Sequence, residues 1–268
     1  MLLSHGENQY SVAKIVAEAE NYRLYICKDV KTDKSCLLQI AAEPEKNGGL
    51  DRAAFVLKEL KQTSDSYEKD YVKSFPDKKL NYDRLFPTVV DSFVSSEQRE
   101  SRINILALKD INDINQLVPL SSLKAKDYLR ISLETSAWIM GRLLKLISFI
   151  HPQGISFRQF DGSNIIIEPK EHFLIVFDWS HVLIHPNDIP LQNRYQDISN
   201  AAKAIFLAIG GDTNSGIYPY DTDHEYPKFL WQLVCQNEGD ALEAHTQFYE
   251  LVHNLFGYEF RPSKFLPL

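Results

Sequence analysis

The chain has 268 residues, of which 44% are hydrophobic and 24% charged, and its formal net charge at pH 7 is -7. This is the composition of an ordinary folded protein with enough apolar material for a core. The negative charge argues against a general nucleic-acid or anionic-membrane binder, because either would need a basic surface. The sequence has no charge-free window long enough for a membrane span and no signal-peptide pattern, so a cytoplasmic protein is expected.

Cysteine and histidine residues are too scattered to indicate a disulfide framework or a zinc site. The three cysteines, Cys27, Cys36 and Cys235, have no C-x-x-C spacing. The eight histidines, which include His151 and His181, form no H-E-x-x-H or similar ligand pair. They are expected at the surface or at its boundary.

Three apolar segments near the start of the chain predict β-strands, at residues 10–17, 21–30 and 34–42. The first alternates apolar and polar residues, and a polar turn of hairpin length separates the second from the third. An antiparallel sheet is therefore expected at the start of the chain.

The next segment, residues 48–64, predicts a helix. Its apolar residues recur every three or four positions, and Asp51 can cap it. Residues 64–81 are polar and rich in lysine, which favours a long connection exposed to solvent, with a docking or disordered loop as the alternative.

Two further apolar segments, residues 86–94 and 103–111, complete a predicted five-stranded sheet. Residues 123–150 then show a long helical pattern with one broad apolar face. This helix is expected to form the core of a second part of the protein.

Residues 155–180 contain two short apolar strands, 165–167 and 173–177, joined by a turn. Asn164 precedes the first strand and Asp178 follows the second. Such a hairpin is expected to place the two oxygen-bearing side chains side by side at one end.

At this point the sequence resembles the eukaryotic-type protein kinase family, whose catalytic loop is H-R-D-L-x-x-x-N and whose metal loop is D-F-G. Phe157, Arg158 and Gln159 stand at the His, Arg and Asp positions, Asn164 at the Asn, and Asp178 at the Asp of D-F-G. The catalytic aspartate is therefore lost. Its replacement, Gln159, is a neutral amide that forms hydrogen bonds but cannot accept a proton from an attacking hydroxyl.

The resemblance extends to the first part of the chain. Residues 24–40, LYICKDVKTDKSCLLQI, follow the family phrase V-Y-x-A-x-D-x-x-T-G-x-x-V-A-x-K. The nucleotide-pairing lysine falls on Gln39, and its partner glutamate in the next helix falls near Ala54. The glycines of the phosphate-covering loop fall on Ala17, Ala19 and Tyr22.

The loop at these positions, residues 17–22, also carries negative charge, which is unfavourable for binding a nucleotide. Glu18 and Glu20 would oppose phosphates, unless they are simply solvated turn residues. Lys14 and Lys28 are the candidates to replace the lost lysine, although exposed strand-end positions are the favoured interpretation for both.

After Asp178 the family has an activation segment that ends in A-P-E. Here only residues 181–196 precede a predicted helix at 194–211, and no A-P-E is present. The resemblance places Asp197 at the characteristic aspartate of that helix and Arg261 at the family's closing arginine.

The rest of the chain is expected to be helical apart from one loop. Residues 205–211, 229–233 and 248–256 predict further amphipathic helices. Residues 216–231, rich in Tyr and Asp without periodicity, predict an irregular surface loop. Its aromatic residues are candidates for protein contact or for buried packing.

Several candidate site residues have two interpretations. Asn164 and Asp178 form a residual metal–nucleotide site, or are held by local hydrogen bonds. Asp161, with His181 as a second choice, is the candidate alternative base, although Asp-Gly usually marks a turn. The resemblance implies that Arg158 pairs with a phosphorylated activation loop, but that segment is short here, so a local structural ion pair is the expected role.

The sequence thus predicts an α+β, bilobal protein kinase-like fold, with a small five-stranded antiparallel sheet lobe at 1–111 and a helical lobe at 112–268. The predicted function is that of a pseudokinase, a catalytically inactive scaffold or regulator that binds a protein partner, and neither nucleic acid nor membrane. No cofactor is required, and Mg²⁺ and ATP remain candidate ligands. The alternatives are an atypical ATP-dependent phosphotransferase, which would use Asn164 and Asp178 for metal and a non-standard base, and a structural module with a filled pocket.

Overall fold

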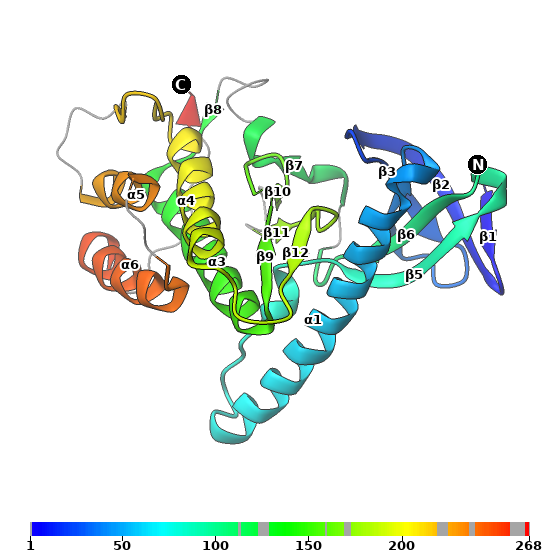
Figure 1. The fold of residues 1–268 in the computed structure, drawn as a ribbon, viewed down its shortest axis with the longest axis horizontal. Helices are drawn as coiled ribbons and strands as arrows, with labels where there is room; N and C mark the ends of the chain where they lie inside the picture. The colour runs from blue at the N-terminus through cyan, green and yellow to red at the C-terminus, as the bar shows by residue number, and fades with distance from the viewer. Residues whose placement is uncertain are drawn as a thin grey trace. The chain divides into compact units, whose positions relative to one another are not determined.

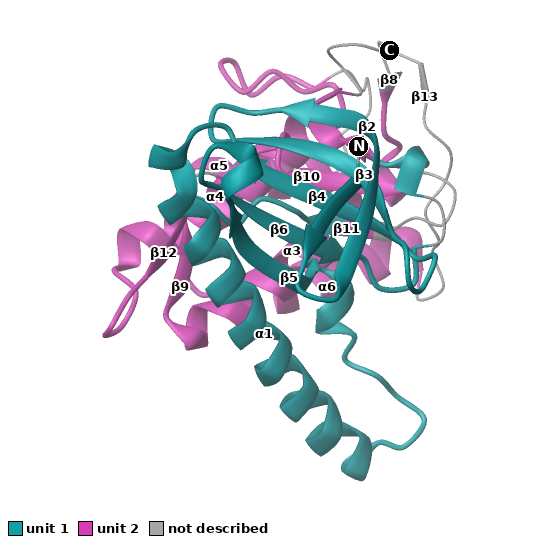
Figure 2. Cartoon of the chain, turned by 90° about the vertical axis from the view of Figure 1, so that its right-hand side faces the viewer, with its two compact units in different colours: residues 1–117, 175–181 teal, residues 118–174, 182–268 magenta. Residues whose placement is uncertain are grey.

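The computed structural model describes residues 2–111, 114–122, 129–158, 160–168, 173–218, 225–235, 239–257 and 266–267. The chain divides into two compact units, unit 1 with residues 1–117 and 175–181 and unit 2 with residues 118–174 and 182–268 (Figure 2). The short segment 175–181, which lies within the expected second lobe, is therefore part of unit 1. Among the described residues, no helix has both the length and the apolar character needed to span a bilayer.

Unit 1 consists of one antiparallel sheet and one long helix (Figure 1). Its elements are β1 (Leu2–His5), β2 (Asn8–Glu18), β3 (Tyr22–Asp29), β4 (Ser35–Ala41), α1 (Asn47–Ser74), β5 (Thr88–Ser95) and β6 (Ser101–Ala107). The strand order is β1-β2-β3-β4-β6-β5. The sheet has six strands and not the predicted five, because the chain turns at Gly6, where φ is +57°, and pairs β1 with β2. β1 is too short to show an alternating pattern of its own.

Alternation along the strands gives the sheet two apolar faces. One face packs into a core that contains Leu3, Tyr10, Val12, Cys27, Cys36, Leu38, Ile40, Phe93, Ile103 and Ile105. On the other face, α1 contacts β5 and β6 with the apolar residues predicted for it. Asn104, fully buried, joins sheet and helix by donating to the Leu50 carbonyl at 2.9 Å. All three cysteines are free, as the sequence predicts.

Helix α1 is longer at both ends than the sequence predicts. It begins at Asn47 with Lys46 as the N-cap, so Asp51 lies inside the helix, and it continues ten residues past Ser64 to Ser74. The predicted connection at 64–81 is therefore mostly helical. Ion pairs at helical spacing, such as Lys61 with Asp65 at 2.5 Å, stabilise this exposed part, and the helix stops just before Pro76.

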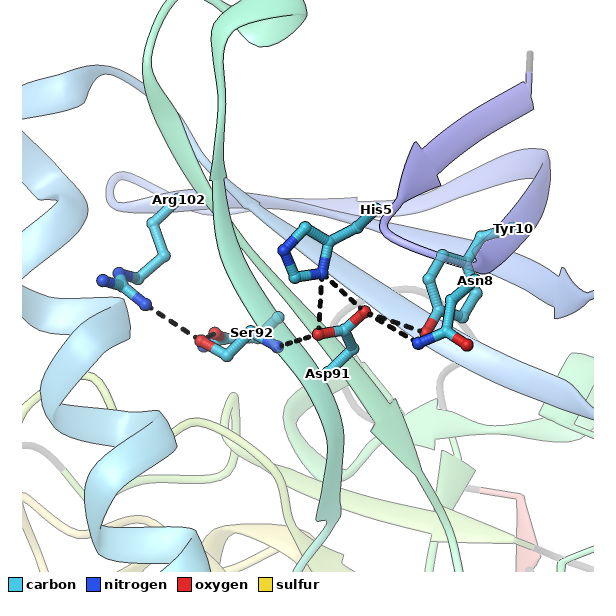
Figure 3. Close-up of polar contacts among 7 residues, drawn as sticks. His5, Asn8, Tyr10, Asp91, Ser92 and Arg102 are labelled. Atoms are coloured by element: carbon cyan, nitrogen blue, oxygen red, sulfur yellow. Dashed lines mark hydrogen bonds and ion pairs between the residues drawn. The ribbon is translucent and has the colours of Figure 1, made fainter.

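The two edge strands of the sheet are joined through the side chain of Asp91 (Figure 3). Asp91 lies next to a register irregularity in β5. Its carboxylate contacts His5 Nδ1 at 3.0 Å and accepts hydrogen bonds from Tyr10 Oη at 3.2 Å and from Asn8 Nδ2 at 3.5 Å. Burial, with the Asp91 charge as the next cause, raises the pKa of Tyr10, so its hydroxyl remains a donor. Side chains thus connect β5 to β1 and β2, with which it has no strand pairing.

We expect Asp91→Ala to lower the free energy of unfolding by about 2 kcal/mol, because it removes the acceptor of a buried tyrosine hydroxyl and two further contacts. Urea unfolding followed by circular dichroism measures this change. Asp70→Ala, which removes an exposed ion pair with Lys73, is the control and should leave the free energy of unfolding nearly unchanged. Equal effects of the two substitutions would contradict the role given to Asp91.

Unit 2 is mainly helical. Its elements are β7 (Val118–Pro119), β8 (Leu129–Arg130), α3 (Leu133–Ile150), β9 (Ile155–Phe157), β10 (Ile165–Glu168), β11 (Phe173–Val176), β12 (Val182–Ile184), α4 (Leu191–Ala208), α5 (Glu225–Cys235), α6 (Ala241–Phe256) and β13 (Leu266–Pro267). β11 carries the chain from unit 2 into unit 1 at Ile175.

Helix α3 forms the centre of unit 2 and contacts both α4 and α6. It starts at Leu133, ten residues later than the predicted 123, because Ser132 caps it and accepts a hydrogen bond from Thr135 N at 3.2 Å. Residues 123–128 lie outside the described residues.

Two further sequence predictions are wrong in unit 2. Residues 205–211 do not form a separate helix, because they belong to the end of α4 and the turn that follows it. The predicted irregular loop at 216–231 is partly helical, since α5 begins at Glu225, while residues 219–224 lie outside the described part. The Tyr226 ring is fully buried in α5, so burial and not exposure explains this aromatic.

Candidate functional site

Residues 175–181, which include Asp178 at the aspartate position of the kinase metal loop, belong to unit 1. Hydrogen bonds fix this segment within the unit. Val176 N donates to the Leu85 carbonyl at 2.8 Å, which attaches the segment to the chain before β5. Trp179 is fully buried, and its indole Nε1 donates to the Val176 carbonyl at 2.8 Å. Asp178 Oδ1 accepts from Ser180 N at 2.9 Å, so a backbone amide holds this carboxylate in a local turn.

Tyr22 stands at the third glycine position of the family's phosphate-covering loop and packs beside this segment. It is only 7% exposed, and its ring centroid lies 6.3 Å from that of Phe177. Burial raises the pKa of Tyr22, and the Asp178 charge adds to the effect. An aromatic ring therefore fills space close to Asp178, where a glycine would leave the backbone accessible to phosphate.

The β2–β3 turn and the start of α1 both contact residues 175–181. The Asn21 side-chain amide contacts the His181 ring, and Arg52 Nη1 donates to the Ser180 carbonyl at 3.4 Å. Glu20 forms an ion pair with Lys46 at 3.0 Å, and Lys46 is the strongest influence lowering the pKa of Glu20. His181, the second candidate base of the sequence analysis, thus contacts Asn21.

Gln39, at the position of the nucleotide-pairing lysine, is 2% exposed in β4. Its Nε2 has no acceptor among the described residues. A neutral amide in this place supplies one hydrogen-bond donor and no positive charge. Neither replacement lysine is suited to the role, since Lys28 is exposed and paired with Asp33 at 3.0 Å, and Lys14 is exposed in β2.

These residues do not fit the phosphates of ATP. The loop positions carry Cβ atoms and a buried ring, the nearby carboxylate of Glu20 engages Lys46, and Gln39 brings no charge. Within the described part of the chain, no group of three or more His, Cys, Asp or Glu side chains is arranged to hold a metal ion. Asp178 and Asn164 belong to different units, so their predicted juxtaposition remains a prediction.

The catalytic-loop region lies in unit 2, and Gln159 itself lies outside the described residues. Asp161 is exposed, and its Oδ1 accepts hydrogen bonds from Ser163 N at 2.7 Å and Ser163 Oγ at 2.5 Å. Asn164 is buried, and its backbone N donates to the Asp161 carbonyl at 3.3 Å. This is the geometry of a turn, the interpretation of Asp-Gly that competes with a base.

A second buried group in unit 2 joins three elements. Asp197 in α4 is completely buried, contacts His151 Nε2 at 2.9 Å and accepts from Phe157 N at 3.1 Å. Burial raises the pKa of Asp197, an effect opposed by His151 and the Phe157 amide. The expectation that His151 lies at the surface or at its boundary is wrong, because this histidine is buried, with 8% of its surface exposed. Phe157 is 2% exposed and stacks on Phe160 with ring centroids 4.5 Å apart.

The local ion pair predicted for Arg158 is not found among the described residues. Arg158 is exposed and makes no ion pair or hydrogen bond with another described residue. Arg261, the other arginine taken from the resemblance, lies outside the described residues. Ala54, at the glutamate position, is 3% exposed on the inner face of α1, where it packs as a small core residue.

Comparisons with known proteins identify the architecture. No protein-family model and no curated protein sequence matches the chain. Among solved structures, vaccinia related kinase 3 is similar with a TM-score of 0.69 at 14% identity, over 98% of this chain and 93% of that chain. The BubR1 kinase domain is similar with a TM-score of 0.62 at 12% identity, over 95% of this chain and 83% of that one. The chain has a protein kinase-like fold.

The kinase-like fold confirms the α+β class and the pairing of an antiparallel sheet with a helical part, with six strands in place of five. At such low identity, the similarity establishes the fold alone. Sequence reasoning missed three contacts around the kinase-like motifs: Tyr22 with Phe177, Asn21 with His181, and His151 with Asp197. Each contact joins residues that are far apart in the chain, so no local sequence pattern predicts it.

Proposed function

We propose that this kinase-like protein is a pseudokinase, which binds a protein partner and does not transfer phosphoryl groups. The observation that carries the proposal is the buried Tyr22 ring beside Phe177 and Asp178. In the kinase mechanism, catalysis consists almost entirely of positioning and charge stabilisation of phosphates. A phosphate group would need the backbone and the space that this side chain occupies.

The losses at the other kinase positions support the same conclusion. Gln159 replaces the residue that orients the attacking hydroxyl, and an amide cannot act as a general base. Asp161, the nearest alternative, is engaged in a turn with Ser163. Gln39 adds no charge near the phosphates. Because each missing group acts on the same transition state, their absence together is far more damaging than any single loss.

Binding to another protein is the function that a kinase-like fold retains when its chemistry is lost. The net charge of -7 disfavours nucleic acid and anionic membranes as partners. The proposal therefore includes a protein partner, a cytoplasmic location, and no requirement for Mg²⁺ or ATP.

A thermal-shift titration with ATP and Mg²⁺ tests the nucleotide part of the proposal. We expect no rise in melting temperature at millimolar ATP. A ligand present at ten times its Kd would stabilise the native state by about 1.4 kcal/mol, a shift that is easily measured. Asp178→Ala is the matched variant, because it removes the retained metal-type carboxylate. A shift in the wild-type protein that is absent from Asp178→Ala would contradict the proposal.

Incubation with labelled ATP and generic protein acceptors tests the chemistry directly, and we expect no transfer of label. If label were transferred, and if transfer were lost in Asp161→Asn, the protein would be an atypical phosphotransferase. Purification of the native protein from its cell, under conditions that preserve complexes, tests the protein-binding part. Recovery of the native protein without a stoichiometric protein partner would argue for a purely structural module.

A further inference from the structure

Two of the three cysteines lie opposite each other in the sheet of unit 1. Cys27 in β3 and Cys36 in β4 form a directly opposed pair in the antiparallel register. Both thiols are free, and both side chains are buried, with 0% and 4% of their surface exposed. The spacing of the cysteines in the sequence does not reveal this pair, because opposition across a hairpin depends on the register of its strands.

The hydrogen-bond pattern of the hairpin sets the distance between the two backbones. Asp29 N donates to the Lys34 carbonyl at 3.0 Å, so these two residues form a hydrogen-bonded pair at the hairpin end. Such pairs recur at every second position of an antiparallel ladder, so Cys27 and Cys36 form the next one, with Cα atoms typically about 5.5 Å apart. Disulfides span Cα separations of about 4.4–6.8 Å. The backbone therefore already meets the distance that a disulfide requires.

The two thiols also share one face of the sheet. Directly opposed residues of an antiparallel pair have Cβ atoms about 4.5–5.5 Å apart on the same face. Accordingly, both cysteines belong to the core cluster that contains Tyr10 and Leu38. A disulfide needs Cβ atoms about 3.5–4.5 Å apart, so the side chains must approach by about 1 Å. The slight strain that results makes the bond easier to reduce, which favours a reversible bond over a permanent one.

The pair is protected from oxidants while the hairpin is closed. Burial raises the pKa of the Cys27 thiol to about 12, and the neighbouring Cys36 is the next cause. Burial also raises the pKa of Cys36. Because the thiolate is the reactive form, reaction requires a transient opening that admits water. Cys36 is the second residue of β4, so opening of the hairpin end exposes it after only a short separation of the strands.

We propose that Cys27 and Cys36 form a reversible redox pair, which closes to a disulfide across β3 and β4 on reaction with a small disulfide such as oxidised glutathione. The Cys36 thiolate attacks one sulfur of the oxidant, which gives a mixed disulfide and releases one glutathione thiolate. The Cys27 thiolate then attacks the Cys36 sulfur and releases the second. The two protein thiols thus lose two electrons and two protons, and the oxidant gains both.

The bond fixes the end of the β3–β4 hairpin. β3 and β4 lie in the middle of the strand order, where β3 also pairs with β2 and β4 with β6. A covalent link between Cys27 and Cys36 prevents the separation that exposes the hairpin end to water. The inference goes beyond the proposed function and does not depend on it, because neither phosphoryl transfer nor partner binding enters the argument.

Equilibration of the folded chain with mixtures of oxidised and reduced glutathione tests the proposal. Cys235→Ala removes the exposed thiol, so that alkylation and mass spectrometry count the pair alone. We expect free thiols to fall from two to none as the oxidised fraction rises, with Cys27 linked to Cys36 in peptide maps, and dithiothreitol to restore both. In the matched variant that also carries Cys36→Ala, the remaining Cys27 should stay free. Amide exchange at Asp29 should slow by about tenfold on oxidation.

Three results would overturn the proposal. The first is a folded protein that keeps both thiols at glutathione ratios that link them in urea, since the link would then belong to the unfolded chain. The second is a disulfide between two chains, seen as a dimer on a non-reducing gel. The third is unchanged exchange at Asp29 in the linked protein. Circular dichroism melting checks that each variant is folded, and the measurements on Cys235→Ala remain decisive even if Cys36→Ala fails to fold.

Discussion

We expect Asp197→Ala to lower the free energy of unfolding by about 3–5 kcal/mol, because it leaves buried groups without their partner. The carboxylate is completely buried and is shared between His151 and the Phe157 amide. It thereby joins α4 to the end of α3 and to β9. Since folded proteins are stable by only about 5–15 kcal/mol, this single change removes a large share of the total. Urea unfolding followed by circular dichroism measures the loss.

Two variants show whether the effect comes from the hydrogen bonds. Asp197→Asn keeps the shape and one acceptor oxygen, and we expect it to cost about 1–2 kcal/mol. Asp188→Ala removes an exposed aspartate of the same unit and should change stability by no more than about 0.5 kcal/mol. If Asp197→Ala were as stable as Asp188→Ala, the buried carboxylate would not be an anchor of the fold.

The sequence predicts the parts of the fold that local periodicity encodes. Strands β2 to β6 coincide with apolar segments, alternating or continuous, so their approximate positions follow from the sequence pattern. β1, with only four residues, is too short for this, and its pairing depends on the turn at Gly6. The second half of α1 has no apolar face to predict it, and depends on ion pairs such as Lys61 with Asp65.

The sequence predicts which residues belong to the candidate site but not how their side chains are arranged in space. Comparison with kinase motifs identifies Gln39, Tyr22 and Asp178 as positions that matter. It cannot show that the Tyr22 ring turns inward toward Phe177, because that depends on the packing of segments more than 150 residues apart.

The largest effect in unit 1 is expected for Trp179→Ala, which should lower the free energy of unfolding by about 3–5 kcal/mol through loss of a fully buried aromatic side chain. The Trp179 ring lies edge-on to Phe86, with ring centroids 6.0 Å apart, and its Nε1 donates a hydrogen bond to the Val176 carbonyl. It therefore attaches the segment around Asp178 to the rest of the unit. Phe55→Ala, at a 57% exposed aromatic of α1, is the control and should cost about 0.5 kcal/mol at most.

Trp179→Phe separates packing from hydrogen bonding and bears on the function of the segment. Phenylalanine is the family residue here, but it lacks the indole N–H, so we expect a loss of about 1–2 kcal/mol. Amide exchange at Val176 and Ser180, whose N–H groups donate to Leu85 and Asp178, should be slow in the wild-type protein and faster in Trp179→Phe. Slow exchange without Mg²⁺ would mean that the packing of Trp179 fixes the position of the Asp178 carboxylate and that no metal ion is needed for it. Rapid exchange in the wild-type segment that slows only on addition of Mg²⁺ would instead mean that Asp178 still serves as a metal ligand.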